Sequence, residues 1–202
     1  MAQDPVDVLK ASNQGVRRIV LENGLTVLLK EDRSAPMAAI QFWVGAGSIH
    51  EAEHLGGGLS HYLEHMVFKG TPTRGPAQVS QEIADAGGDI NAYTSNDRTV
   101  FHTSLPASRW QVGLEVLADA VFHPAFPEDE WAREREVILR EVDMGEDDPG
   151  RVMNRLTWET AFRTHPYRVP IIGWRDILVT MNRDDLIAYH RRHYSPDNMI
   201  LS

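Results

Sequence analysis

The chain has 202 residues, of which 42% are hydrophobic and 24% are charged, and this balance is typical of a folded globular protein rather than a disordered one. Its formal net charge of −9 and the lack of a long Lys/Arg stripe argue against a nucleic-acid partner. No apolar run reaches the length of a membrane span, so we expect no membrane partner, and the lack of cysteine excludes disulfides and thiolate metal sites. Composition leaves the compartment open, because a bacterial-type cytoplasmic protein and an exported one both fit.

The elements expected along the chain begin with an N-terminal arm over residues 1–15, which show no sustained periodicity. Asn23-Gly24 between two β-prone runs, 17–21 and 25–29, predicts a hairpin. The further predicted elements are a strand over 38–44, a helix that begins near Leu59, a helix over 77–85, a second hairpin of strands 90–94 and 99–105, helices over 109–121, 128–143, 152–162 and 183–193, and a last strand that opens at 198–202. Hairpin connections with helices between them favour an α+β fold, with a mainly antiparallel sheet packed with helices.

The helix near Leu59 contains the segment His61-Tyr62-Leu63-Glu64-His65. At about 100° per residue, positions i, i+3 and i+4 of a helix lie in one narrow sector, so both imidazoles can bind one Zn²⁺ while Glu64 reaches a water held there. The order H-x-x-E-H is the inverse of the common zinc-protease motif. A pair of exposed helix histidines is the competing interpretation, and a third metal ligand is needed to decide between the two.

Two glutamates of the predicted helix 128–143 are candidates for that third ligand. Glu134 and Glu141 are seven residues apart, about two turns, so they project from nearly the same face. One could bind the metal while the other supports a ligand from behind it. The alternative is that both are solvated partners of the neighbouring arginines, as we expect for Glu130 and Glu136.

Together, His61, Glu64, His65, Glu134 and Glu141 resemble the inverzincin zinc metallopeptidases, the family of pitrilysin, insulin-degrading enzyme and the mitochondrial processing peptidase. Three longer segments strengthen the likeness: 58–71 resembles the zinc helix and its exit, 86–94 the substrate-side strand, and 193–199 the approach to the last strand. The resemblance implies that His61, His65 and Glu141 bind Zn²⁺, that Glu64 is the catalytic base, and that Glu134 supports the ligand shell.

The same resemblance assigns a substrate role to Asn91, Ala92, Tyr93 and Thr94, which periodicity alone describes as an ordinary strand. In the family this segment is a sheet edge to which an extended peptide adds as a further strand. The implied function is a zinc metalloendopeptidase whose partner is a short peptide or an unfolded polypeptide. His190 and His193, one turn apart, are expected on a solvated surface, and the five tryptophans in the core.

The family resemblance also implies a partner for the catalytic domain 16–202, either a second peptidase half-domain or a homodimer partner. Because 198–202 has the pattern of an opening strand, we expect the chain to be the C-terminally truncated first domain of a multi-domain peptidase, weakly active or inactive alone. Two alternatives remain open: a non-catalytic partner subunit of a peptidase assembly, and a non-peptidase zinc hydrolase that uses the same helix by convergence.

Overall fold

The computed structural model describes residues 15–202, so all of the predicted arm except Gly15 lies outside the described residues. Within them, one sheet contains the strands β1 (Val16–Val20), β2 (Thr26–Lys30), β3 (Met37–Val44), β4 (Asp89–Thr94), β5 (Thr99–Pro106) and β6 (Met199–Leu201). The α-helices of the same residues are α2 (Leu59–Val67), α3 (Gln78–Asp85), α4 (Trp110–Phe122), α5 (Glu128–Glu146), α6 (Pro149–Ala161), α7 (Arg175–Leu178) and α8 (Arg183–His193). The predicted α+β fold is confirmed.

The strand order is β1-β2-β6-β3-β5-β4, and every neighbouring pair is antiparallel except β2 and β6. Both predicted hairpins are present. In the first, Gly24 takes a φ of +91°, and the Asn23 side chain accepts a 3.2 Å hydrogen bond from the Leu25 N–H. In the second, β4 pairs only with β5 among the described strands, so β4 forms one edge of the sheet.

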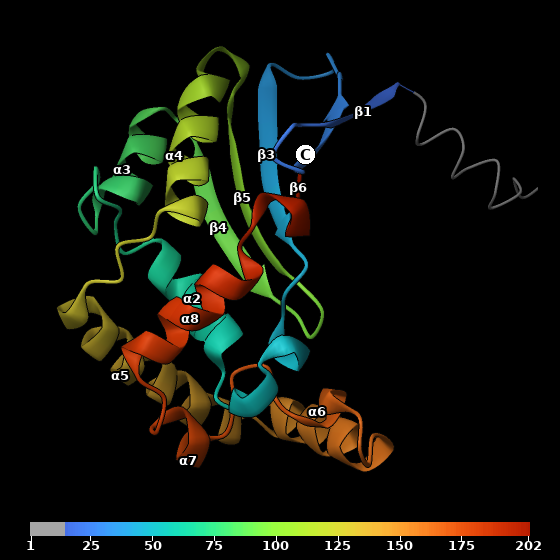
Figure 1. Cartoon of the computed structure of the whole chain (residues 1–202), viewed down its shortest axis with the longest axis vertical. Coiled ribbons are helices and arrows are strands. Elements are labelled where there is room, and N and C mark those ends of the chain that lie inside the picture. Colours follow the sequence, from blue (N-terminus) through green and yellow to red (C-terminus); the bar gives the residue numbers. More distant parts are fainter. Residues whose placement is uncertain (1–14) are drawn as a thin grey trace, which may run out of the picture.

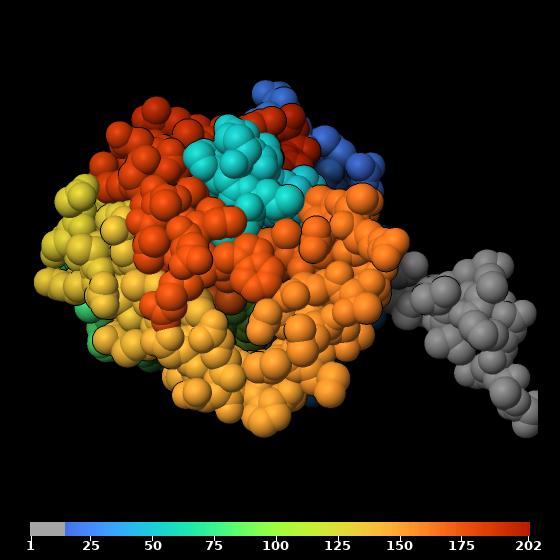
Figure 2. All heavy atoms as spheres, turned by 90° about the horizontal axis from the view of Figure 1, so that it is seen from below, coloured from blue at the N-terminus to red at the C-terminus, as the bar shows by residue number. Residues whose placement is uncertain are grey.

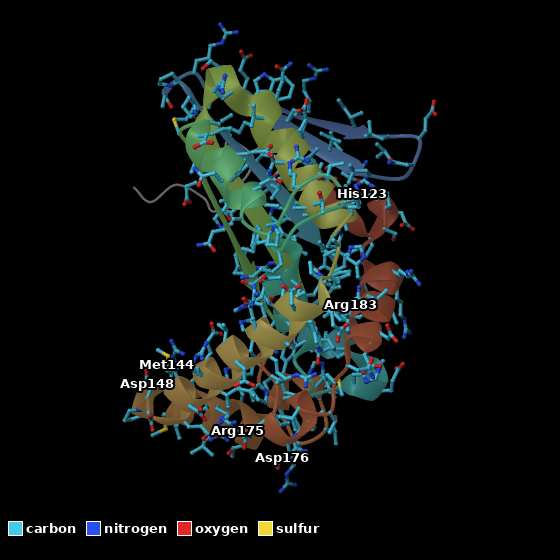
Figure 3. All side chains as sticks on the ribbon, turned by 90° about the vertical axis from the view of Figure 1, so that its left-hand side faces the viewer. His123, Met144, Asp148, Arg175, Asp176 and Arg183 are labelled. Atoms are coloured by element: carbon cyan, nitrogen blue, oxygen red, sulfur yellow. The ribbon has the colours of Figure 1, made fainter. Side chains whose placement is uncertain are left out.

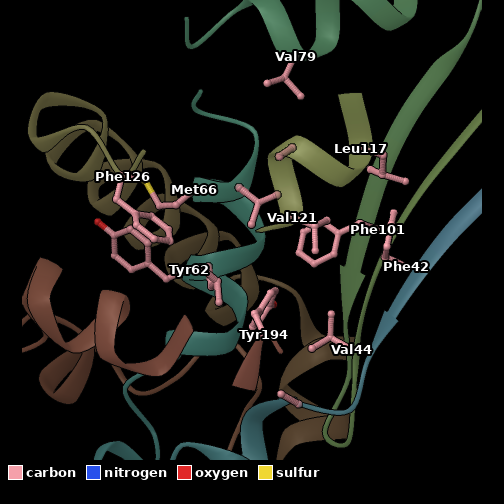
Figure 4. Packing of buried hydrophobic residues seen from close by; sticks show 14 of the residues in the cluster. Phe42, Val44, Tyr62, Met66, Val79, Phe101, Leu117, Val121, Phe126 and Tyr194 are labelled. Carbon is pink, nitrogen blue, oxygen red and sulfur yellow. The ribbon is translucent and has the colours of Figure 1, made fainter. Parts of the chain in front are cut away.

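Helices α3 and α4 cover one face of the sheet (Figure 1), and the core lies between these layers. Alternation along β3 produces this arrangement, because Ile40, Phe42 and Val44 are buried while Met37 is exposed. Figure 4 shows the cluster of Phe42, Phe101, Val121 and Tyr194 that joins the sheet to the helices. Full burial of a side chain such as Phe101 contributes about 1.5–3 kcal/mol to folding.

Helix α2 packs against α5, α8 and the edge strand β4, below the part of the sheet that α3 and α4 cover (Figure 1). It is enclosed by segments that are far apart in the sequence. Helices α5, α6 and α7 form the foot of the molecule, and Figure 3 shows Met144 and Asp148 where α5 passes into α6. None of the helices in residues 15–202 is both long and apolar enough to cross a bilayer.

Several local expectations were wrong, and each error has a physical cause. Helix α6 begins at Pro149 rather than at 152, because Asp148 accepts hydrogen bonds from the Gly150 and Arg151 N–H groups and Pro149 fits a first turn. The short α7 was not predicted. Trp131 is buried, but Trp110 is 47% exposed, so tryptophan size alone did not predict burial.

His190 is also buried, in contrast to the expected solvated surface. Its Nε2 lies 2.9 Å from the Val121 carbonyl oxygen, and its ring packs edge-on against Phe126. A satisfied hydrogen bond makes a buried imidazole tolerable, so this histidine joins α8 to the end of α4.

Candidate active site

Helix α2 buries its apolar residues Leu59, Leu63 and Met66 completely. His61 and Glu64, by contrast, remain partly accessible on the opposite side. The hydrophobic face therefore anchors the helix, and the three polar residues of the motif face a cleft against α5 and β4.

The N-terminus of α2 is held by Glu51, a residue that the sequence analysis missed. Glu51 is only 2% exposed, and its two carboxyl oxygens accept hydrogen bonds from the Gly58 N–H at 3.1 Å and the Ser60 N–H at 2.9 Å. These are N–H groups that a helix cannot satisfy internally. Burial raises the pKa of Glu51 to about 7, although the N–H and hydroxyl of Ser60 and the Gly58 N–H oppose that rise. The only sequence signal was a carboxylate placed shortly before a glycine-led helix start.

Helix α5 is fixed against α2 by an aromatic pair. The Tyr62 and Trp131 rings stack with centroids 3.9 Å apart and planes 12° from parallel, and the Tyr62 hydroxyl donates to the Trp131 carbonyl oxygen at 2.5 Å. Both residues are buried. This contact sets the distance between the helix that carries the histidines and the helix that carries the glutamates.

The structure brings His61, His65 and Glu141 together. The Glu141 Oε2 atom lies 3.7 Å from His61 Nε2 and 3.9 Å from His65 Nε2, and one candidate ligand atom from each residue lies within 4.8 Å of the others. Ligands of a tetrahedral Zn²⁺ lie about 3.4 Å apart when each bond is about 2.0–2.2 Å long. Small side-chain movements therefore separate this arrangement from a zinc shell, and two imidazoles with one carboxylate is a donor set that zinc accepts.

The protonation state of His61 and the orientation of the His65 ring also suit metal binding. Burial, followed by the charge of His65, lowers the pKa of His61 to about 3, so its ring is neutral near pH 7. Its Nδ1 atom has no hydrogen-bond partner among the described residues. His65 differs, because its Nδ1 lies 2.9 Å from Glu134 Oε2, which leaves Nε2 as the atom that faces Glu141.

Glu134 links His65 to a lysine. The other oxygen of its carboxylate lies 2.6 Å from Lys69 Nζ. Burial alone would raise the pKa of Glu134, but the hydrogen bonds and charges of Lys69 and His65 outweigh it, and the pKa lies below its ordinary value. Glu134 is therefore an anion that orients His65. Lys69, which lies in the segment 58–71 just after the zinc-motif helix, is its counter-ion, and no sequence signal indicated this role.

Glu64 lies in the same cleft. Burial raises the pKa of Glu64, and a hydrogen bond from the Thr94 hydroxyl at 2.6 Å opposes that rise. Glu64, His65, Phe68, Lys69, Asn91 and Glu134 line a hollow of about 200 Å³. The candidate base is thus beside the candidate metal-binding cluster and beside the edge of the sheet.

The four residues of β4 that were predicted to bind substrate fall into two sets. Ala92 packs against the core, and Thr94 contacts Glu64 on α2. Alternation places the side chains of Asn91 and Tyr93 on the other side of the strand, where both are exposed. The pairing of Ser95 with Arg98 makes 94 and 99 a non-hydrogen-bonded pair.

It follows from this register that the main-chain groups of Ile90, Ala92 and Thr94 point away from β5. The Ala92 N–H is taken by the Asn91 side chain, whose Oδ1 accepts it at 2.8 Å. Apart from the Ala92 N–H, the outer edge of β4 therefore presents the outward main-chain N–H and C=O groups of these three residues beside Glu64.

A larger cavity of about 520 Å³ adjoins Glu141 and is enclosed by α5, α6 and the segment 167–175; Figure 2 shows its opening. Trp158, Trp174 and Ile172 supply apolar lining. Arg168 is exposed at its rim and forms no ion pair within residues 15–202. This cavity is large enough for a bulky side chain.

Comparisons with known proteins agree with this geometry. A family model described as Insulinase (Peptidase family M16) matches residues 26–174. The chain is 33% identical over 187 residues to the uncharacterized zinc protease YmxG of Bacillus subtilis (strain 168), with 93% of this chain and 46% of that protein covered. It is 36% identical over 186 residues to the probable mitochondrial-processing peptidase subunit beta of Arabidopsis thaliana, with 92% and 35% covered.

Among solved structures, a protease from Helicobacter pylori superposes with a TM-score of 0.87 at 26% identity, over 92% of this chain and 45% of that one. The chain therefore spans less than half the length of each of these three relatives.

Proposed function

Because this chain belongs to the insulinase family, peptidase family M16, we propose that residues 16–202 are the catalytic domain of a zinc-dependent metalloendopeptidase. Its substrates are unfolded polypeptides or short peptides. The observation that supports the proposal most directly is the convergence of His61, His65 and Glu141 from two helices onto one point.

In this proposal His61, His65 and Glu141 hold the zinc ion, and Glu134 keeps the His65 ring in place. A bound zinc ion supplies a Lewis acid that polarises the scissile carbonyl and makes water acidic near neutral pH. Glu64 takes the proton from the attacking water and returns it to the leaving amine. The burial that raises the pKa of Glu64 suits a group that must both accept and release a proton.

The substrate binds in an extended form along the outer edge of β4. Main-chain groups of Ala92 and Thr94 hydrogen-bond to it, while Asn91 and Tyr93 contact it from the strand's exposed side. The Asn91 side chain must first release the Ala92 N–H. The cavity beside Glu141 receives a substrate side chain.

A second half-domain or a homodimer partner completes an enclosed chamber around the substrate, and the 202 residues alone bind zinc but cleave poorly. Relatives of about twice this length support that expectation. The non-catalytic alternative predicts that the chain binds no metal, and a metal assay distinguishes the two.

Substitutions of three glutamates test the proposal in the protein as its gene encodes it. We expect Glu64→Gln to keep one zinc ion per chain and to lose at least about a hundredfold in kcat, the size of a typical acid–base contribution. We expect Glu141→Gln to lower zinc affinity, measured by competition with a chelator. Glu136→Gln, on an exposed position of the same helix, is the matched control. Unchanged turnover in Glu64→Gln, or unchanged zinc affinity in Glu141→Gln, would contradict the assigned roles.

A further inference from the structure

The Thr94 hydroxyl contacts the side chain that the proposed function makes the catalytic base. Its Oγ1 lies 2.6 Å from Glu64 Oε2, whereas the Ser60 carbonyl oxygen and Thr99 Oγ1 lie farther away, at 3.4 Å and 3.5 Å. A hydrogen bond to a carboxylate is shorter and stronger than one between neutral groups. The contact with Glu64 is therefore the dominant one.

The available hydroxyl protons decide which group donates in this hydrogen bond. An ionised carboxylate can only accept, so Thr94 is the donor. The fully buried Thr99 donates its own hydroxyl proton to the Ala46 carbonyl oxygen at 3.0 Å. Thr99 can therefore face Thr94 only as an acceptor, at 3.5 Å, and the shorter contact of 2.6 Å directs the single hydroxyl proton of Thr94 to Glu64.

The backbone keeps Thr94 in place. It lies in β4 directly opposite Thr99 in a non-hydrogen-bonded pair, where opposing side chains are closest. A β-branched residue in a strand has few χ1 rotamers. Glu64, in contrast, has a long side chain whose several rotamers must be restricted before it can act at one point.

The surroundings of Glu64 offer a competing position for its carboxylate. Lys69 lines the same hollow of about 200 Å³, and its ammonium group pairs with Glu134. A carboxylate that is free to rotate could turn toward that ammonium group. The hydrogen bond from the Thr94 hydroxyl opposes that rotation.

We infer that Thr94 is a positioning residue: its hydroxyl holds the Glu64 carboxylate between the metal-binding cluster and the substrate edge of β4. This inference rests on the proposed role of Glu64 as base. It gives Thr94 a side-chain role in addition to the main-chain role proposed for substrate binding.

Two substitutions separate the hydroxyl from the shape of the side chain. Thr94→Val keeps the β-branched shape and removes the donor, whereas Thr94→Ser keeps the donor. We expect Thr94→Val to lower kcat about 10- to 100-fold with KM and zinc content unchanged, and Thr94→Ser to recover most of the activity. Thr103→Val is the control, because Thr103 donates to the Asp89 carbonyl oxygen at the other end of the same hairpin.

A double-mutant cycle on the metal-free chain tests the contact between Thr94 and Glu64 without an activity assay. It compares the unfolding equilibrium constants of the wild type, Thr94→Val, Glu64→Ala and the double variant in urea. We expect the combined effect of the two substitutions on the unfolding equilibrium constant to differ about tenfold from the product of their separate effects. Thr103→Val should show no such coupling with Glu64→Ala.

The two experiments distinguish the inference from the proposed function. Absence of coupling overturns the inference, and so does a Thr94→Val enzyme with the kcat of the wild type. If the zinc-loaded wild type cleaves no peptide in its complete assembly, the proposed function fails. The coupling measurement then still decides whether Thr94 holds Glu64.

Discussion

The buried carboxyl group of Glu51 gives a sharp prediction about stability and pH. Burial raises its pKa from 4.5 to about 7 in the folded protein. The folded state therefore binds the proton more tightly than the unfolded state. The stability that the bound proton contributes is fully present below about pH 4.5, and it is lost as the pH rises through about 7.

The magnitude follows from the two pKa values. A shift from 4.5 to about 7 corresponds to about 3 kcal/mol in total, of which about 2.5 kcal/mol is lost between pH 5 and pH 8. Glu51→Gln cannot ionise and imitates the protonated acid in size and shape. We therefore expect this variant to gain about 2.5 kcal/mol relative to the wild type over that range.

Urea unfolding of the metal-free protein at several pH values measures the difference. Comparison with the variant cancels the contributions of other groups, including His61. Glu53→Gln is the matched control, because Glu53 is exposed in the same segment and its carboxylate stays in water in both states. If the stability of Glu51→Gln falls relative to the wild type as the pH rises, the helix terminus holds the Glu51 anion and the reasoning is refuted.

Three further substitutions test the contacts around the site. Trp131→Ala removes the stack on Tyr62 and should lower the free energy of unfolding, measured in urea, by about 3–5 kcal/mol. An unchanged zinc affinity in the folded variant would show that this stack does not position α5. Lys69→Met removes the partner of Glu134 and should weaken zinc binding about tenfold in a chelator competition. Arg140→Met, on the exposed side of α5, should leave the zinc affinity unchanged. Equal zinc affinities of the two variants would contradict the role of Lys69. Gly47→Ala places a Cβ atom 2.3 Å from the Ser95 carbonyl oxygen and should lower the free energy of unfolding by about 1–3 kcal/mol. Gly145→Ala, whose Cβ atom would lie no closer than 4.0 Å to any described residue outside its own stretch of helix, should not destabilise the protein. Equal stabilities of the two variants would mean that the β4–β5 turn moves freely.

Local signals in the sequence predicted most elements, and the structure confirms them where the signal was strong. The Asn23-Gly24 turn and the helix over 183–193 agree with the observed elements. The predicted helix start at 152 was wrong, because the cap at Asp148 was not recognised. The burial of His190 could not be predicted, since its partner is a carbonyl group 69 residues earlier in the chain.

For the site, helical spacing predicted which side chains share one face of a helix. The family resemblance predicted that the histidines of α2 and the glutamates of α5 belong to one site. Neither contains information on Glu51, whose carboxylate reaches the N-terminus of α2 from an irregular segment. The link from Lys69 through Glu134 to His65 likewise depends on the packing of α5 against α2.

The sequence by itself determined most of the secondary structure, the face on which His61, Glu64 and His65 lie, and the family, because these depend on short periodic patterns and on motif identity. Tertiary structure alone decided the insertion of β6 between β2 and β3, the stacking of Tyr62 on Trp131, and the contact of Thr94 with Glu64. Each of these contacts joins residues at least 30 positions apart. Their distances and burial are set by how whole layers pack, which no local pattern records.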